Sequence, residues 1–286
     1  MSADITVVIP TLGRPVLSRA LAALQAGSTL PAEVIVVDQS QSAEVEAMVK
    51  HAADHGLAAR WLPSDTRGRA AGLNRGMEAA RTRFVAITDD DCLPDPHWVE
   101  RLATALAADP SSIVTGRVEA GDDSVIITVT GQDATVQRRR AFGFDRLSGG
   151  NMAMATQVVA AIGGFDEDPT VRTAEDHEFA YRALRAGIPI RYVPDAAVTH
   201  LGWRDEGARE AQYSSYARSH GGFYGKYLRR GDAFIALRAT MHWLRATRRW
   251  LSALVRRDHE RARMSRAYVT GLPAGVRAGW RGGRRQ

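Results

Sequence analysis

Three consecutive carboxylates are the clearest chemical feature of the sequence. Asp89, Asp90 and Asp91 follow the apolar run 84–87. Like charges this close repel one another unless a cation or hydrogen-bond donors compensate them. Grouped carboxylate oxygens suit Mg²⁺ or Mn²⁺, which typically bridge to substrate phosphates. The alternative is a solvated acidic turn that caps a helix near Pro94, but a position at the end of a buried strand favours metal binding.

Three other carboxylates are candidates for chemistry. Asp38 directly follows the apolar run 34–37, where it can accept hydrogen bonds from a nucleotide base or ribose, or serve as a turn residue. Glu175 and Asp176 stand at a predicted helix start, where the helix dipole stabilises negative charge. Capping is one interpretation of this pair, and a general base that deprotonates an acceptor hydroxyl is the other.

Two weaker features depend on their context. Gly149, Gly150 and Asn151 form either a flexible turn or a substrate loop. His200, with Trp203 three residues later, is either a structural histidine or a metal ligand beside a sugar-stacking aromatic ring.

Alternating strands and helices must position these residues. Buried strands are predicted from β-branched and apolar runs, and helices from apolar residues at helical spacing. The expected strands are 5–9, 34–37, 60–62 and 84–87. Helices are expected over 15–26, 43–55 and 95–107, and a turn followed by a helix over 68–80. This order predicts βαβ units and a mostly parallel, Rossmann-like α/β sheet flanked by helices. Ligands of such sheets bind beyond the carboxyl ends of the strands, so Asp38 and the Asp89–Asp91 cluster should face one crevice.

The second half of the chain is expected to turn helical. A strand at 125–129, helices at 156–163 and 174–186, and a strand at 190–193 are predicted, and the chain is helical and Arg-rich from about residue 207. We therefore divide it into a catalytic domain over 1–205 and a basic helical C-terminal extension over 206–286.

Composition limits the function classes. With 286 residues and a single cysteine, Cys92, the chain can build a large core but neither an intrachain disulfide nor a multi-cysteine metal site. The N-terminus lacks the features of a signal peptide, and the uncharged stretch 147–165 is too interrupted for a membrane span. We expect a cytoplasmic protein.

Charge is distributed unevenly. Residues 204–286 carry 19 Lys and Arg against 6 Asp and Glu, whereas residues 1–203 carry 19 against 26. A helix over 233–257 would place Leu and Trp side chains opposite Arg238, Arg245, Arg249 and Arg256. Such helices bind anionic membrane surfaces, so a peripheral place on the inner face of the membrane is expected. In the alternative, the apolar side packs on the catalytic domain or a second subunit.

The ordered set of motifs resembles the inverting family 2 glycosyltransferases with the GT-A fold. The resemblance spans roughly residues 4–203, and seven motifs in order make it specific. They are Val8-Ile9-Pro10-Thr11 with Arg14, Asp38, Gly68 through Gly76, Asp89-Asp90-Asp91 with Pro94-Asp95, the loop 149–151, Gly163 to Asp166, and Glu175-Asp176 through Gly187 followed by His200.

This resemblance implies a role for each matching residue. A nucleotide-diphosphate sugar would be bound by Pro10, Thr11, Arg14, Asp38, Arg67, Asp89 and Asp90, with Arg69 as the other candidate for the basic residue. Asp91 and His200 would hold Mg²⁺ or Mn²⁺. Asp176, beside Glu175, would be the catalytic base. Gly150, Asn151 and Trp203 would bind the acceptor, which is a glycan, a lipid-linked molecule or a small molecule.

Parts of the sequence are compatible with two other functions. A sugar-nucleotide nucleotidyltransferase has a similar sheet but needs a Gly-rich loop with a basic residue after the first strand, which residues 10–15 imitate only superficially. A nucleic-acid-binding protein could use the Arg-rich tail, but no aromatic-plus-basic platform or zinc motif accompanies it, so we expect no nucleic-acid partner.

Overall fold

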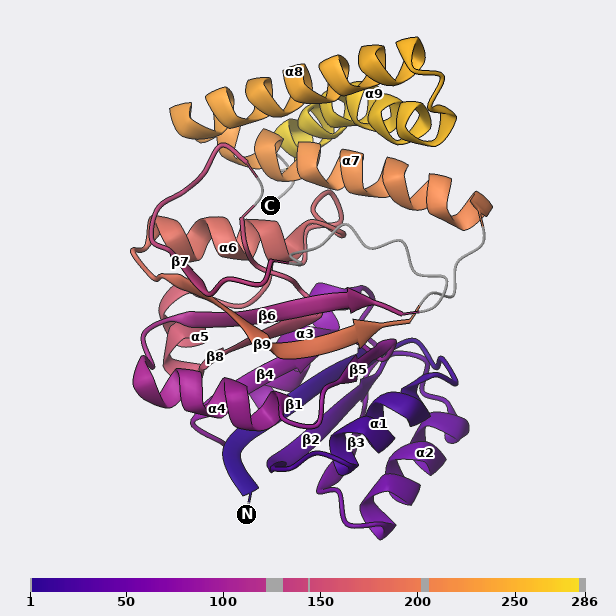
Figure 1. The fold of residues 1–286 in the computed structure, drawn as a ribbon, viewed down its shortest axis with the longest axis vertical. Helices are drawn as coiled ribbons and strands as arrows, with labels where there is room; N and C mark the ends of the chain where they lie inside the picture. The colour runs from indigo at the N-terminus through magenta and orange to yellow at the C-terminus, as the bar shows by residue number, and fades with distance from the viewer. Residues whose placement is uncertain (1, 122–130, 144, 202–205, 283–286) are drawn as a thin grey trace. The chain divides into compact units, whose positions relative to one another are not determined.

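The protein forms two compact units. The computed structural model describes residues 2–121, 131–143, 145–201 and 206–282 (Figure 1). The sheet unit comprises Met1–Arg139, Arg146–Phe165 and Phe179–Trp203, and the helical unit comprises Arg140–Asp145, Asp166–Glu178 and Arg204–Gln286. A single cut in chain order therefore does not separate the two units.

A mixed sheet is the centre of the sheet unit. Its strands run in the order β3-β2-β1-β4-β8-β6-β9-β5, and β7 pairs with β9. The strands are β1 (Ser2–Thr11), β2 (Leu30–Asp38), β3 (Ala59–Pro63), β4 (Phe84–Thr88), β5 (Cys92–Pro94), β6 (Ile113–Ala120), β7 (Thr135–Gln137), β8 (Asn151–Ala155) and β9 (Ile190–His200). The neighbours β3, β2, β1 and β4 are all parallel, which confirms the predicted α/β fold. Antiparallel β8 joins this parallel half to β6 and β9.

Helices pack on this sheet through apolar stripes. They are α1 (Leu17–Gln25), α2 (Ala43–Asp54), α3 (Arg69–Ala79), α4 (Trp98–Ala108), α5 (Thr156–Ile162) and α6 (Glu175–Arg185), the last of which contributes residues to both units. Leu17, Leu21 and Leu24 recur at helical spacing in α1 and are buried. Ser42 caps α2 because its hydroxyl accepts hydrogen bonds from the Glu44 and Val45 amides.

Most predicted elements lie within a few residues of the observed ones. β9 begins where the predicted strand 190–193 begins but continues to His200, and this extension carries His200 to the end of the sheet. β8 was not predicted as a strand, because the run Asn151–Ala155 lacks β-branched residues. The strand predicted at 125–129 lies outside the described residues.

The helical unit contains α7 (Glu206–Leu228), α8 (Ala233–Val255) and α9 (His259–Gly282) (Figure 1). The backbones of α7 and α9 approach closely through glycines. A Cβ atom added to Gly275 would lie 2.0 Å from the Arg218 carbonyl oxygen, and one added to Gly279 would lie 2.1 Å from that of Gly222. Gly221 and Gly225 face α9 in the same way. Within the described chain, no helix combines the length and hydropathy needed to span a bilayer.

This close approach gives a stability prediction. We expect Gly275→Leu to destabilise the helical unit by about 3 kcal/mol, the upper end of the usual cost of overpacking, because the added side chain meets backbone that cannot move aside without separating the helices. Thermal unfolding followed by far-ultraviolet circular dichroism measures the effect. Ala274→Leu is the matched control, since Ala274 is the preceding residue of α9 and is exposed. Equal melting temperatures for the two variants would contradict the packing described here.

The side of α8 that packs inward is not the predicted one. Its buried residues are Ile235, Arg238, Ala239, Ala246 and Ala253. The Arg238 guanidinium is 2% exposed and bonds to the Asp145 carboxylate at 2.8 Å. Burial opposes the charge of Arg238, but Asp145 and Tyr224 together outweigh that effect and raise the pKa of Arg238 above its usual value. The prediction that Arg238 lies on a solvent-facing side of the helix is therefore wrong, because its ion pair with Asp145 holds it in the interior.

Candidate functional site

The carboxyl ends of three parallel strands bring the predicted residues together. β1 ends at Thr11, which pairs with Asp38 at the end of β2, and β4 lies on the other side of β1 and leads into Asp89. This confirms the prediction that the aspartates after β2 and β4 lie at one edge of the sheet.

Asp90 is the fully buried member of the Asp89–Asp91 cluster and is held by two side chains from the end of β1 and the loop after it. It accepts a hydrogen bond from the Thr11 hydroxyl at 2.6 Å and pairs with the Arg14 guanidinium. Arg14 also donates to Asp91 Oδ2 at 2.8 Å. Burial of Arg14 disfavours its charge, but Asp91 and Asp90 outweigh burial and raise its pKa above the usual value. Arg14 therefore remains cationic and offsets part of the repulsion among the aspartates.

Asp89 is turned toward the loop that precedes β8. The Arg69 guanidinium bonds to Asp89 Oδ1 at 2.7 Å and to the Gly149 carbonyl oxygen at 2.7 Å. A Cβ atom on Gly150 would lie 2.9 Å from Asp89 Oδ2, so this glycine lets the loop backbone approach the carboxylate. Arg67, the residue of this segment that is expected to bind the donor, is exposed.

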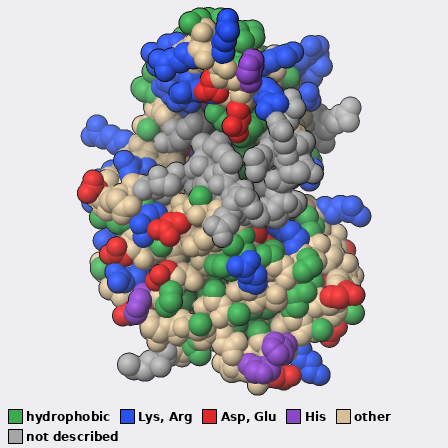
Figure 2. Space-filling model, turned by 45° about the vertical axis from the view of Figure 1, so that its right-hand side comes forward, with side chains coloured by type: hydrophobic (Ala, Val, Ile, Leu, Met, Phe, Trp, Pro, Cys, Tyr) green, Lys and Arg blue, Asp and Glu red, His purple; other side chains and the backbone are tan. Residues whose placement is uncertain are grey.

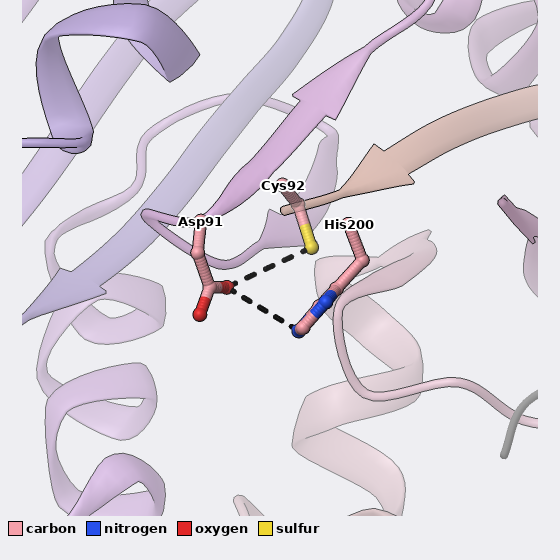
Figure 3. A group of neighbouring side chains, drawn as sticks. All are labelled: Asp91, Cys92 and His200. Atoms are coloured by element: carbon pink, nitrogen blue, oxygen red, sulfur yellow. Dashed lines mark hydrogen bonds and ion pairs between the residues drawn. The ribbon is translucent and has the colours of Figure 1, made fainter. Parts of the chain in front are cut away.

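Asp91 faces a histidine and a thiol. His200 Nε2 lies 3.7 Å from Asp91 Oδ1, and the Cys92 sulfur lies 4.0 Å from the same oxygen (Figure 3). These three residues can offer one ligand atom each, all within 4.8 Å of one another. Burial raises the pKa of the Cys92 thiol well above its usual value, so the thiol is protonated near neutral pH. A carboxylate oxygen and an imidazole nitrogen at this separation fit a divalent cation such as Mn²⁺ or Mg²⁺.

Asp38 is enclosed by its own turn. Its two oxygens accept hydrogen bonds from the Ser40 amide and hydroxyl, the Ser42 amide and the Trp61 indole. Burial disfavours the charge of Asp38, but the hydrogen bonds from Ser40 and Trp61 outweigh it and lower its pKa. Asp38 is therefore an ionised residue that shapes the end of β2. The neighbouring Gln39 holds the segment before α3 through the Thr66 and Gly68 carbonyl oxygens.

Asn151 points into the sheet. Its side-chain oxygen accepts from the Trp98 indole at 2.8 Å, and its nitrogen donates to the Arg117 and Ala196 carbonyl oxygens at 2.9 and 2.8 Å. These bonds fix the start of β8 and so position Gly150 against Asp89. Trp203, the third residue predicted to contact an acceptor, lies outside the described residues.

Glu175 and Asp176 begin α6 and belong to the helical unit. Glu175 is 4% exposed, whereas Asp176 is only half-buried. An Asp176 oxygen accepts a hydrogen bond from the His177 amide at 2.8 Å. Of the two carboxylates, Asp176 is thus the one that solvent or a substrate can reach.

The sequence did not single out every residue at the site. The sequence offers Arg69 only as an alternative to Arg67, yet in the structure Arg69 bonds to both Asp89 and the loop at Gly149. As the single cysteine of the sequence, Cys92 excludes an intrachain disulfide and a multi-cysteine metal site, but the sequence gives it no further role. Its pairing with His200 joins strands more than a hundred residues apart in sequence, and no local pattern reports such a contact.

Comparison with known proteins assigns a family to this arrangement. The family profile described as "Glycosyltransferase like family 2" matches residues 3–220. The chain is 28% identical over 236 residues to a chondroitin synthase from Escherichia coli, an alignment that covers 68% of this chain and 34% of that protein. It is 28% identical over 228 residues to a pre-mycofactocin glycosyltransferase from Mycobacterium tuberculosis, covering 75% and 47%. The chain thus spans a third to a half of these relatives.

Solved structures share the fold. A mannosyltransferase from Pyrobaculum calidifontis in complex with GDP-Man and Mn²⁺ superposes with a TM-score of 0.62 at 19% identity, covering 98% of this chain and 86% of the other. Residues 1–349 of TarS from S. aureus, in complex with UDP-GlcNAc, give a TM-score of 0.61 at 14% identity, covering 97% and 92%. At these identities the likeness is one of fold.

Proposed function

The chain belongs to glycosyltransferase-like family 2, and we propose that it transfers a sugar from a nucleotide-diphosphate donor to a hydroxyl acceptor with inversion at the anomeric carbon. One observation carries the proposal. The end of β9 places His200 beside Asp91, while Arg14 pairs with Asp90 as well as Asp91 and Arg69 pairs with Asp89. The family assignment favours neither a nucleotidyltransferase nor a nucleic-acid-binding protein.

Donor binding is assigned to the edge formed by β1, β2 and β4. Pro10, Thr11 and Asp38 would shape the pocket for the base and ribose, and Asp89 would bind the ribose or sugar. Arg14 and Asp90 would keep this edge rigid, and the exposed Arg67 would reach the phosphates. The structural neighbours hold GDP-Man in one case and UDP-GlcNAc in another, so a donor screen should include both nucleotides.

Asp91 and His200 would hold a Mn²⁺ or Mg²⁺ ion. When bound, the ion neutralises the negative charge that develops on the departing diphosphate. The residues fit this assignment, since a carboxylate and an imidazole are suitable ligands and their candidate atoms lie 3.7 Å apart.

Acceptor activation is assigned to Asp176. Asp176 is half-buried and stands in the first turn of α6, where its carboxylate can accept the proton of an incoming hydroxyl. Glu175, which is buried beside it, would support its position. Gly150 and Trp203 are proposed to contact the acceptor, with Asn151 fixing the loop that carries Gly150.

Removing the charge of Asp91 tests the metal assignment. We expect Asp91→Asn to lower metal-dependent affinity for UDP or GDP by about a hundredfold or more, beyond most losses caused by outer-sphere partners. Isothermal titration calorimetry with and without Mn²⁺ measures it. Asp195→Asn is the control, because Asp195 is an exposed carboxylate of the same unit. A variant at Asp91 that binds nucleotide as the wild type does in Mn²⁺ would refute the assignment.

A second surface supports peripheral attachment to an anionic membrane. On α8, Leu237, Leu244 and Leu251 recur every two turns and are each about half exposed, and Leu254 and Val255 extend this stripe. The exposed Arg248, Arg249, Arg256 and Arg257 accompany it. Figure 2 shows Lys and Arg side chains gathered beside apolar ones on the surface of the helical unit. Interfacial helices combine side chains in this way, and we propose an anionic lipid surface as the partner of this α8 stripe.

A further inference from the structure

The environment of Cys92 is set by strand pairing. β5 and β9 are antiparallel, and Cys92 lies directly opposite His200 in the register. Residues directly opposite each other in an antiparallel pair project from the same face of the sheet, so strand pairing makes the Cys92 thiol and the His200 imidazole neighbours. Asp91 precedes Cys92 in the chain and turns its Oδ1 atom toward both side chains (Figure 3).

We propose that Cys92 is a third metal ligand beside Asp91 and His200. The three residues together then form a binding site for Zn²⁺ and other thiophilic divalent cations. The inference rests on the proposed role of Asp91 and His200 as metal ligands. The three candidate ligand atoms lie within 4.8 Å of one another, so small side-chain movements bring them around one ion. Formation of the bond between Cys92 Sγ and the metal releases the thiol proton to the solvent, and no electron transfer is involved.

Ligand chemistry determines which ions use the sulfur. Zn²⁺ is commonly bound by Cys, His and Asp side chains, and three protein ligands leave one position for water or substrate. Mg²⁺ and Mn²⁺ prefer oxygen ligands and gain little from a thiolate. The same site therefore takes Mn²⁺ through Asp91 and His200, and Zn²⁺ through those residues and Cys92. Zn²⁺ then displaces Mn²⁺ and competes with the ion that serves donor binding.

Co²⁺ is the spectroscopic probe for this inference. Titration of the full chain with Co²⁺ should produce two signals, d–d absorption in the visible and a sulfur-to-cobalt charge-transfer band in the near ultraviolet. Because Cys92 is the only cysteine among the 286 residues, a thiolate band reports on this position alone. Addition of Zn²⁺ should remove both signals stoichiometrically.

The matched variant is Cys92→Ser, which keeps the size of the side chain and removes the soft ligand. We expect it to lose the charge-transfer band and to bind Zn²⁺ at least about tenfold more weakly, the lower end of the cost of losing even an outer-sphere partner. Its affinity for Mn²⁺, measured from the paramagnetic resonance signal of the free ion, should stay close to the wild-type value. An unchanged Mn²⁺ affinity also shows that the variant is folded.

The outcomes separate this inference from the proposed function. If Co²⁺ binds to the wild type with d–d absorption but no charge-transfer band, the thiol is not a ligand, and only the inference about Cys92 fails. Equal Zn²⁺ affinity in the wild type and Cys92→Ser overturns the same inference. If neither Co²⁺ nor Mn²⁺ binds to the wild type, the metal assignment of Asp91 and His200 fails and takes the inference with it.

Discussion

Asp176→Asn should lower turnover by roughly 10²-fold or more, the scale at which a positioned general base contributes. Donor affinity should barely change, because the proposed base acts on the acceptor hydroxyl and not on the nucleotide. Asparagine keeps a side-chain oxygen that can accept the hydrogen bond from the His177 amide. Unlike the carboxylate, however, the asparagine side chain cannot accept a proton from the acceptor hydroxyl. Steady-state release of nucleoside diphosphate, combined with calorimetric titration of nucleotide, measures both quantities.

The competing explanation is that Asp176 only stabilises the start of α6. A carboxylate in the first turn of a helix contributes about 0.3–1 kcal/mol through the helix dipole. If that were its whole role, Asp176→Asn would show a slightly lower melting temperature and normal turnover. Glu260→Gln is the control, since Glu260 is an exposed carboxylate in the first turn of α9. A normal turnover in Asp176→Asn would exclude Asp176 as the base.

The parallel half of the sheet could be predicted because local patterns encode it. The β-branched runs of β1 and β2 are buried on both faces, and the helices between them show apolar residues at helical spacing. The carboxyl-end rule then placed Asp38 and the aspartate cluster at one edge without any knowledge of distant contacts.

The other half of the sheet, in which β6 and β9 are parallel and the remaining pairs are antiparallel, could not be predicted in the same way. β8 is a run of small and unbranched residues, and its identity as a strand depends on its pairing with β4 and β6. The pairing of Cys92 with His200 likewise depends on β9 continuing past Val193, which its sequence does not signal. The strand propensity of a local sequence does not identify a strand whose formation depends on its pairing with distant strands.

Arg238 illustrates a limit of helical periodicity. A helical wheel places Arg238 with Arg245, Arg249 and Arg256 on a polar face, because it uses only the type and the spacing of the residues. The structure buries Arg238 because Asp145, about ninety residues earlier in the chain, supplies the opposite charge. A buried charge is tolerated only with such a partner, and the partner cannot be found from the helix alone.

The exposed α8 stripe should hold the chain on anionic vesicles, and this effect should be close to all-or-none. Arg248, Arg249, Arg256 and Arg257 each contribute about 1 kcal/mol near an anionic surface, so together they change the partition by about a thousandfold. Wild-type protein should sediment with phosphatidylserine-containing vesicles at low salt and ignore neutral vesicles. High salt should release it, since ionic screening weakens surface electrostatics but not packing.

The sharpest variant changes the stripe without disturbing the helical unit. Removal of α8 would take away a packing partner of α7 and α9, so point substitutions are preferable to truncation. Leu244→Glu with Leu251→Glu replaces two half-exposed leucines and should abolish sedimentation. Ala274→Glu with Ala278→Glu is the matched control, because it adds the same charge at exposed positions of α9. Continued sedimentation of the Leu244/Leu251 variant would refute the proposal. A wild-type dimer that this variant loses, without any vesicle binding, would instead identify a second copy of the chain as the occupant of the stripe.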